Sequence, residues 1–300
     1  HSFRDYRPAG TVAYVGAAHI GASNRPKPAS FALPYHLSPP MPQRVLVTAG
    51  GSGIGLVIAQ AFAAAGERVH VCDIDRSRLE AVSASSEIGT TAVDVSDPDQ
   101  VAALFDEVQS ELGGLDVLVN NAGTAGPTGP FESLSFDDWH STLAVNLDSQ
   151  FLCTRLAVLM LKTACGGSIV NISSTAGLHG YPLRAPYAVA KWGVIGLTKT
   201  LAMELGPYGI RVNAICPGSV GGDRMDRVVA AEATTRGVSE KQVREGFLRQ
   251  TSMRMFVRAE DVAAMVLFLC SDAGAAISGQ AIAVDGHTEG LGTLRVEIPR

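Results

Sequence analysis

Short apolar segments alternate with longer amphipathic segments along most of the chain. The apolar segments are rich in Val, Ile and Leu, which is typical of buried strands, and they cover residues 44–48, 68–72, 90–93, 115–119, 168–174, 210–215 and 280–284. Helical patterns lie between them, over residues 56–65, 98–112, 136–162, 187–205 and 259–270. Strands that alternate with helices predict an α/β fold with a doubly wound parallel sheet.

A glycine-rich turn joins the first strand to the first helix. It reads Ala49-Gly50-Gly51-Ser52-Gly53-Ile54-Gly55, and strand, glycine turn and helix together are the context that a dinucleotide-binding loop requires. Glycines let the backbone approach a pyrophosphate, and the helix N-terminus offers free N–H groups. Asp73 ends the second strand eighteen residues past Gly55, near the spacing expected for a carboxylate on an adenosine ribose; a plain turn residue is the alternative. We therefore expect a Rossmann-like sheet in a single domain.

A hydroxyl, a phenol and an ammonium lie close together in the sequence at Ser174, Tyr187 and Lys191. A helix would place Tyr187 and Lys191 on one face because they are four residues apart, although this pair alone is common in helices. Lowering a phenol pKa from about 10 to about 7 takes about 4 kcal/mol. An ammonium about 4 Å away supplies about that much at an effective dielectric of about 20. The pair is therefore a candidate acid/base near neutral pH, and Ser174 could hold a carbonyl or carbinol oxygen.

The composition narrows the class of protein. The chain has 300 residues, is 46% hydrophobic and 18% charged, and carries a net charge of −5. These values suit one globular domain of about 250 residues with extensions and argue against nucleic acid as a partner. The longest apolar stretches contain polar residues, so we expect no membrane-spanning helix. Five scattered cysteines without a C-x-x-C pair predict buried thiols in a reducing compartment, the cytoplasm, and no metal site.

The two ends of the chain differ from its middle. Residues 1–40 hold six prolines and one acidic residue and show no periodicity, so we interpret them as a disordered leader or a segment added during cloning. Met41, the first methionine, is the expected natural start. Residues 41–290 are the predicted catalytic domain, in which residues 219–255 form a substrate lid, and residues 291–300 are a tail.

Several motifs in one order and spacing make the chain resemble a classical short-chain dehydrogenase/reductase over about residues 43–289. The motifs are Thr48–Gly55, Asn120-Asn121-Ala122-Gly123, Asn146, Ser174, Tyr187-x-x-x-Lys191 and Pro217-Gly218. The resemblance implies hydride transfer between NAD(H) and a secondary alcohol or ketone. It assigns general acid/base catalysis to Tyr187 and the substrate oxygen to Ser174. It further assigns the nicotinamide ribose to Lys191, which also lowers the Tyr187 pKa, and a water-linked proton path to Asn146.

The resemblance also implies cofactor contacts at the carboxyl ends of the strands. Besides Tyr187 and Lys191, these are Gly51, Ser52, Gly53, Ile54, Gly55, Asp73, Asp94, Val95, Asn121, Ala122, Gly123, Pro217, Gly218 and Val220. A carboxylate at Asp73 favours NAD, because it would repel the 2′-phosphate of NADP. Arg76 and Arg78 lie just beyond it and keep NADP open as the less favoured cofactor, although we expect both to begin the next helix and face solvent.

The chain departs from the family pattern at two positions. Ala49 stands where the family usually has the first glycine of the loop, and Ala adopts positive φ only at a cost. We therefore expect Gly50 and Gly51 to supply the backbone freedom. Gly222 stands where the family often has a Thr that bonds the carboxamide of the cofactor. We expect that hydrogen bond to be missing or supplied by another group, and the loop that follows to be mobile.

The sequence does not identify the substrate. Arg184 fits an acidic substrate or solvent exposure equally well, and arginines of the lid such as Arg224 are more commonly solvent-exposed than substrate-binding. The resemblance leaves a NADPH-dependent 3-ketoacyl-thioester-type reductase as the alternative activity. A non-catalytic dinucleotide-binding scaffold is less favoured because Tyr187 and Lys191 are both present. An epimerase or dehydratase of the extended relatives would need a larger carboxyl-terminal domain than residues 219–255 provide.

Small and apolar residues on the helices at 136–162 and 187–205 predict self-association. A sheet covers only one stripe of each helix, so these helices would leave apolar surface uncovered. The family usually pairs these helices across subunits. We therefore expect a homo-oligomer, a tetramer rather than a dimer, that acts on a small-molecule substrate with neither nucleic acid nor membrane as a partner.

Overall fold

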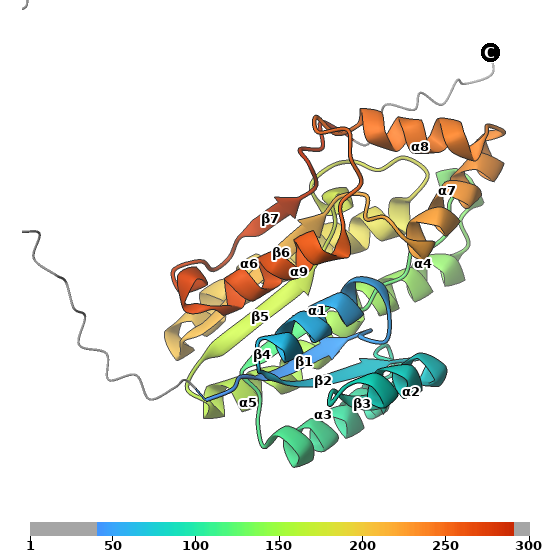
Figure 1. The fold of residues 1–300 in the computed structure, drawn as a ribbon. Coiled ribbons are helices and arrows are strands. Elements are labelled where there is room, and N and C mark those ends of the chain that lie inside the picture. The colour runs from blue at the N-terminus through green and yellow to red at the C-terminus, as the bar shows by residue number, and fades with distance from the viewer. Residues whose placement is uncertain (1–40, 291–300) are drawn as a thin grey trace, which may run out of the picture. The chain divides into compact units, whose positions relative to one another are not determined.

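The computed structural model describes residues 41–290, in which one sheet of seven parallel strands lies between layers of helices (Figure 1). The strands are β1 (Arg44–Thr48), β2 (Arg68–Asp73), β3 (Gly89–Ala92), β4 (Val117–Asn120), β5 (Gly167–Ile172), β6 (Ile210–Pro217) and β7 (Ala281–Val284). Their order across the sheet is β3-β2-β1-β4-β5-β6-β7, so the order reverses between β1 and β4. The predicted doubly wound parallel sheet is confirmed.

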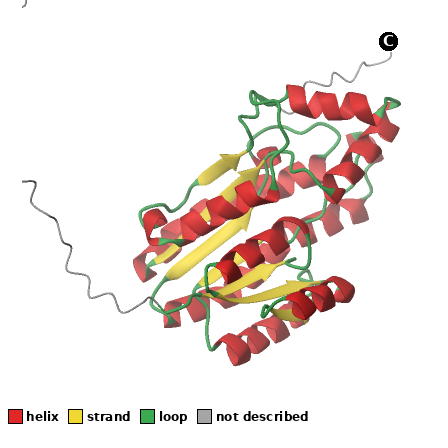
Figure 2. Cartoon of the chain, in the orientation of Figure 1, coloured by secondary structure: helices red, strands yellow, loops and turns green. Residues whose placement is uncertain are grey.

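Helices cover both faces of the sheet (Figure 2). One face carries α1 (Gly53–Ala64), α2 (Arg76–Ser85) and α9 (Ala259–Cys270), and the other carries α3 (Pro98–Leu112), α5 (Ser149–Thr163) and α6 (Ala185–Leu205). Successive side chains of a strand point to opposite faces. Val45 and Val47 of β1 accordingly belong to the core that includes α1 and α9, while Leu46 belongs to the core that includes α3 and α5. Burial on both faces explains why these strands are almost wholly apolar.

Local signals set the bounds of α3 as the sequence predicts. The Asp97 side chain accepts hydrogen bonds from the N–H groups of Asp99 and Gln100, and Pro98 occupies the first turn. Gly113 ends the helix with a φ of 73°. The cap, the proline and the glycine all act within one turn of the helix ends. No distant contact is therefore needed to set where α3 begins and ends.

The helix predicted over residues 136–162 is interrupted. α4 (Phe136–Leu143) leads through a π-helical turn, Ala144–Asp148, into α5. Such a turn changes the direction in which the following side chains point and is frequent at functional sites. Asn146 lies in this turn, is fully buried, and donates from Nδ2 to the Thr142 carbonyl at 2.8 Å. Apolar periodicity alone does not reveal the interruption, because the residues on both sides remain helical.

By length and composition, the stretch Phe136–Thr163 could cross a membrane, with a mean hydropathy of 1.2. One such stretch is weak support for a span, since a core helix of a soluble protein passes the same test. In the described residues its α5 part packs Cys153, Ala157 and Leu161 against the sheet. Only 33% of the apolar window is buried, so much of its apolar surface remains uncovered within the chain.

Two helices form a layer beyond the carboxyl ends of the strands, drawn in orange in Figure 1. They are α7 (Asp223–Arg236) and α8 (Glu240–Arg249). Met225, Val229 and Phe247 form the centre of a separate apolar cluster here, against which Tyr181 packs. Gly222 is the N-cap of α7 with a φ of 125°, so the segment after Gly222 is a helix and not the loop that we expected.

The turn between β1 and α1 places its left-handed residue at Ala49 and not at its glycines Gly50 and Gly51. Ala49 has a φ of 51°, whereas Gly50 and Gly51 do not adopt a positive φ. The expectation that Gly50 and Gly51 take over the backbone freedom is therefore wrong. These glycines serve close packing instead, because a Cβ on Gly50 would lie 2.5 Å from the Val71 Cβ.

Replacing Ala49 with Gly should raise the free energy of unfolding by about 0.5–1 kcal/mol. A left-handed Ala costs about 1–2 kcal/mol, and Gly removes this cost. Gly also has greater entropy in the unfolded state, which offsets about 0.4–1 kcal/mol of the stabilisation. The measurement is urea unfolding at one protein concentration. Ala65→Gly is the matched control: Ala65 follows α1 with an ordinary φ of −79°, so the same change there should destabilise the protein. A loss of stability in Ala49→Gly would contradict the claim that the backbone at Ala49 is strained.

Candidate active site

The candidate catalytic side chains meet where β4 and β5 end and α6 begins. Ser174 follows β5, Tyr187 and Lys191 lie in the first two turns of α6, and Asn146 lies in the π-helical turn. Lys191 is 3% exposed, and its Nζ lies 5.7 Å from the centre of the Tyr187 ring. The four residues that the sequence singled out for catalysis are thus brought to one place by three separate elements.

The Lys191 ammonium is hydrogen-bonded to the backbone of the sheet. Its Nζ donates to the Ile172 carbonyl at 2.9 Å, at the last residue of β5. Burial lowers the pKa of Lys191 to about 8, although the neighbouring phenol of Tyr187 acts in the opposite direction. An ammonium with so little solvent around it acts strongly on its neighbours, because the local dielectric is low.

The Tyr187 phenol has a pKa below its ordinary value. Burial raises that pKa, but the positive charges of Lys191, Arg224 and Arg184 lower it, and so does the Ser174 side chain. Ser174 itself is half-buried and its Oγ accepts the N–H of Ala176 at 3.1 Å. The arrangement therefore provides a proton donor and acceptor beside a hydroxyl that has remaining hydrogen-bonding capacity.

The Asn146 side chain offers a hydrogen-bond acceptor near Lys191. Its Oδ1 is buried and has no hydrogen-bond partner among the described residues. A Cβ built on Gly123 would lie 2.8 Å from this Oδ1 and 3.4 Å from the Lys191 Nζ. Asn146, Gly123 and Lys191 therefore border one small space, and a buried polar atom left open there is expected to bind water or a ligand.

The glycine loop fits a dinucleotide phosphate. The first turn of α1 has no side-chain cap and no acidic residue, so its N–H groups are open to an anion. Gly55 cannot carry a side chain, because a Cβ there would lie 2.2 Å from the Ala49 carbonyl oxygen and 2.4 Å from the Asn121 Nδ2. The loop of Gly51, Ser52, Gly53, Ile54 and Gly55 thus has the tight backbone and the open helix start that a phosphate cradle requires.

Asp73 lies at the end of β2 and faces the same loop. It is 7% exposed, and its Oδ2 accepts the Gly51 N–H at 3.1 Å. Its Oδ1 accepts the N–H of Asp75 at 3.0 Å. The carboxylate is thus fixed beside the cradle, where an adenosine ribose of a bound dinucleotide would lie.

Arg78 does not simply face solvent as the sequence suggested. Its Nη1 donates to the Ser52 Oγ at 2.8 Å, and its Nε lies 3.0 Å from the Asp75 Oδ2. The guanidinium therefore borders the cradle near Asp73. Arg76 begins α2 as expected and is exposed.

The other predicted cofactor residues lie at strand ends along the same edge. Asp94 and Val95 follow β3, Asn121, Ala122 and Gly123 follow β4, Pro217 ends β6, and Gly218 and Val220 come after it. Asn121 links the end of β4 to the end of β1, because its Nδ2 donates to the carbonyls of Thr48 and Ala49 at 3.0 and 3.1 Å. Val220 forms a parallel bridge with Val257. All of them therefore lie at the carboxyl-end edge of the sheet, where sheets of this kind bind ligands.

Three further residues lie at the site to which the sequence analysis assigned no role. Thr48 accepts two backbone N–H groups at its Oγ1, those of Asn121 and Ala122. Gln150 is 1% exposed, lies one turn after Asn146, and its Oε1 has no partner among the described residues. Arg184 is 4% exposed, although its position in a polar loop gave no sign of burial.

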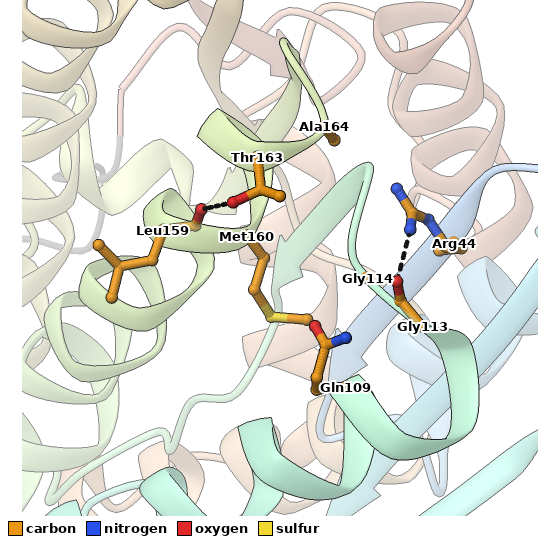
Figure 3. A pocket seen from close by; sticks show the side chains of 8 residues that line it. All are labelled: Arg44, Gln109, Gly113, Gly114, Leu159, Met160, Thr163 and Ala164. Carbon is orange, nitrogen blue, oxygen red and sulfur yellow. Dashed lines mark hydrogen bonds between the residues drawn. The ribbon is translucent and has the colours of Figure 1, made fainter.

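A hollow at the opposite edge of the sheet offers no comparable chemistry (Figure 3). It lies between α3 and α5, where Gln109, Leu159 and Met160 line it. Its one charged group is Arg44, which is already bonded to Asp116 and to the Gly113 carbonyl. Among residues 41–290 there is also no cluster of three or more His, Cys, Asp or Glu side chains that could hold a metal ion.

Comparisons with known proteins identify the family of this chain. The family described as enoyl-(acyl carrier protein) reductase matches residues 48–287. D-beta-hydroxybutyrate dehydrogenase of Rhizobium meliloti (strain 1021) is 35% identical over 255 residues, which cover 82% of this chain and 98% of that protein.

Solved structures show the same fold. An NAD+-bound xylitol dehydrogenase has a TM-score of 0.77 and 31% identity, over 80% of this chain and 96% of its own. A single-residue variant of actinorhodin polyketide ketoreductase with NADPH has a TM-score of 0.78 and 34% identity, over 84% of this chain and 98% of its own. This chain belongs to the classical short-chain dehydrogenase/reductase family.

Proposed function

We propose that this oxidoreductase, which acts on CH–OH groups, uses NAD(H) and interconverts a secondary alcohol and a ketone with Tyr187 as general acid/base. The observation that carries the proposal is the buried Lys191 ammonium beside the Tyr187 phenol, whose pKa lies below its ordinary value. A bound nicotinamide ring would supply the acceptor or donor of the hydride. The residues of the chain have to bind the two reactants and move one proton.

The four catalytic side chains have different tasks in this proposal. Tyr187 takes the hydroxyl proton when the alcohol is oxidised and returns it when the ketone is reduced. Ser174 holds the oxygen on which this proton changes place. Lys191 stabilises the phenolate and binds the nicotinamide ribose. Asn146 uses its open Oδ1 to hold a water that links Lys191 to solvent.

Residues 41–290 form the catalytic domain in this proposal, and residues 219–255 form its lid. Support for the lid comes from α7 and α8, which lie beyond the carboxyl ends of the strands as a cluster of their own. The cytoplasm is the proposed compartment. Among the described residues all five cysteines are free thiols, four of them buried, which suits a reducing environment.

Tyr187→Phe should reduce turnover by about 10²–10⁴-fold, because the ring remains and the transferable proton is lost. Wild-type alcohol oxidation needs the phenolate, so its rate should rise as pH rises through the lowered Tyr187 pKa. The measurement is NADH formation against pH with a panel of secondary alcohols, together with NADH affinity by fluorescence. NADH affinity should be nearly unchanged.

Tyr181→Phe is the matched control for this test. Tyr181 is a second phenol near Arg184, but burial raises its pKa above the ordinary value. It cannot supply a proton acceptor near neutral pH, so its variant should keep most of the turnover. Activity that survives in Tyr187→Phe and disappears in Tyr181→Phe would reverse the assignment.

NAD is the proposed cofactor because Asp73 is fixed where the 2′-phosphate of NADP would approach. Arg78, beside the same cradle, is the observation that favours the alternative, a NADPH-dependent 3-ketoacyl-thioester-type reductase. Similar solved proteins bind either cofactor, since the xylitol dehydrogenase holds NAD+ and the polyketide ketoreductase holds NADPH. A non-catalytic scaffold is less favoured, because the acid/base residues are assembled.

Asp73→Ser should lower the ratio of kcat/KM for NAD over NADP by about 10–100-fold, the scale of one charged hydrogen bond. Arg78→Ala should leave the preference for NAD intact, and Arg76→Ala serves as the control because it removes a neighbouring arginine that is exposed. Wild-type enzyme that uses NADP as well as NAD would contradict the proposal. A loss of NADP use confined to Arg78→Ala would support the alternative.

We propose a homotetramer because α5 and α6 leave large apolar side chains uncovered. On α5, Phe151 and Leu159 are 52% and 64% exposed, and on α6 Val189 and Trp192 are 46% and 51% exposed. Exposed apolar patches of this kind mark association surfaces. Light scattering at micromolar concentration should give a tetramer mass for the wild type.

The double variant Phe151→Glu/Trp192→Glu should lower that mass, since it places charges on the proposed contact. Phe131→Glu is the control, because Phe131 is 72% exposed but lies on a different element. A monomeric wild type would refute the tetramer.

A further inference from the structure

Arg184 is a buried cation without an anionic partner. It is 4% exposed, and its Nε is buried without any hydrogen-bond partner in residues 41–290. Its Nη2 donates to the Ala125 carbonyl at 2.6 Å, and it forms no ion pair within the same residues. A buried charge that is not paired is costly. The positive charge of Arg184 is therefore not balanced by a negative side chain among residues 41–290.

The backbone fixes this guanidinium beside the catalytic phenol. Its Cζ lies 5.2 Å from the centre of the Tyr187 ring and 5.3 Å from the centre of the Tyr181 ring. Leu183, the preceding residue, has a φ of 64°, which is strained for a side chain of this size. The Leu183 carbonyl is in turn held by the Gly129 N–H at 3.0 Å. Strain that is maintained in this way places Arg184 at the site rather than in solvent.

A second arginine, Arg224, lies on α7 of the proposed lid. Arg224 lies in the first turn of α7 and is exposed. Met225, the next residue of α7, belongs to the apolar cluster against which Tyr181 packs, and the positive charge of Arg224 lowers the pKa of both Tyr187 and Lys191. Arg224 forms no ion pair among residues 41–290.

The nearby carboxylates do not neutralise these two arginines. Glu232 of α7 lies near Tyr181, but Arg236 takes its Oε1 at 2.9 Å. Asp226 pairs with Arg244 at 2.6 Å. Asp223 forms no ion pair within the described part of the chain. The positive charge between α6 and α7 is therefore left for a ligand to balance.

We propose that the substrate carries an oxyanion, a carboxylate in the simplest case, that binds between Arg184 and Arg224 next to Tyr187. The inference rests on the proposed function, because it assigns the charge of the alcohol or ketone that this site receives. A planar guanidinium matches the two oxygens of a carboxylate or a phosphate. Arg184 supplies the buried cation of the site, and Arg224 supplies an exposed one from α7.

The test compares ligands that share a cyclohexyl ring and differ in the charged or neutral group attached to it, and it does not need turnover. The binding of cyclohexanecarboxylate, cyclohexylphosphonate and the neutral cyclohexanecarboxamide to the enzyme–NADH complex is measured by calorimetry. At least one of the two anions should bind at least about tenfold more tightly than the amide. The difference should shrink as salt is raised, because the lid-side charge is exposed. A preference for the phosphonate alone would assign phosphate esters, and a preference for the carboxylate would assign hydroxy acids.

Variants separate this site from a structural role of the arginines. Arg224→Ala should remove most of the preference for the anion, whereas Arg227→Ala, an exposed arginine one turn further along α7, should keep it. Arg184→Met should also remove it; if that variant does not fold, Arg224→Ala decides alone. Equal binding of anions and amide by the wild type, or a preference that survives in Arg224→Ala, would overturn the proposal.

Failure of the proposed function would be seen separately. NADH affinity, measured in the same samples, and oxidation of neutral secondary alcohols both test the oxidoreductase without the anion site. An enzyme that binds NADH and oxidises neutral alcohols but ignores the charge of the ligand would keep its proposed function and lose this inference. An enzyme that does not bind NADH would lose both.

Discussion

The burial of one ammonium against one carbonyl is the constraint on which the site depends. The Lys191 Nζ donates to the Ile172 carbonyl at the end of β5, in a place with almost no solvent. Solvent cannot screen the charge there, so it acts on Tyr187 at short range. The same charge requires acceptors nearby, which explains why the open Oδ1 of Asn146 borders the same space. The buried position of Lys191 on α6 thus determines both the packing around the ammonium and its effect on the acid/base residue Tyr187.

A buried polar network holds the two helices that carry this arrangement. The Asn120 Nδ2 donates to Asn171 and to Thr154, each at 2.9 Å, and the Asn171 Nδ2 donates to Thr198 at 2.9 Å. The network connects β4 and β5 to α5 and α6. A single such bond contributes about 0.5–1.5 kcal/mol, but an unpaired buried partner costs about 1–3 kcal/mol. A shift of either helix would therefore break its bond to the network and leave a buried polar group unpaired, and this stabilises the position of Lys191 on α6.

Features set by neighbouring residues could be predicted from the sequence, whereas features set by distant contacts could not. Strand β1 and helix α3 follow from apolar runs, a cap, a proline and a glycine that act locally. The π-helical turn around Asn146 and the left-handed Ala49 depend on packing against other elements, and both differed from expectation. Arg184 shows the limit most clearly, because contacts with Ala125, Tyr181 and Tyr187 bury it only in the folded protein.

The central claim is that Lys191 lowers the pKa of Tyr187, and an ultraviolet titration of tyrosinate tests it without any substrate. The difference between the titration curves of the wild type and Tyr187→Phe isolates one phenol among six tyrosines. This phenol should ionise below pH about 10, the ordinary tyrosine value, and Lys191→Met should move its ionisation to higher pH. A Tyr187 that ionises at the ordinary value, or at the same pH with and without Lys191, would contradict the account.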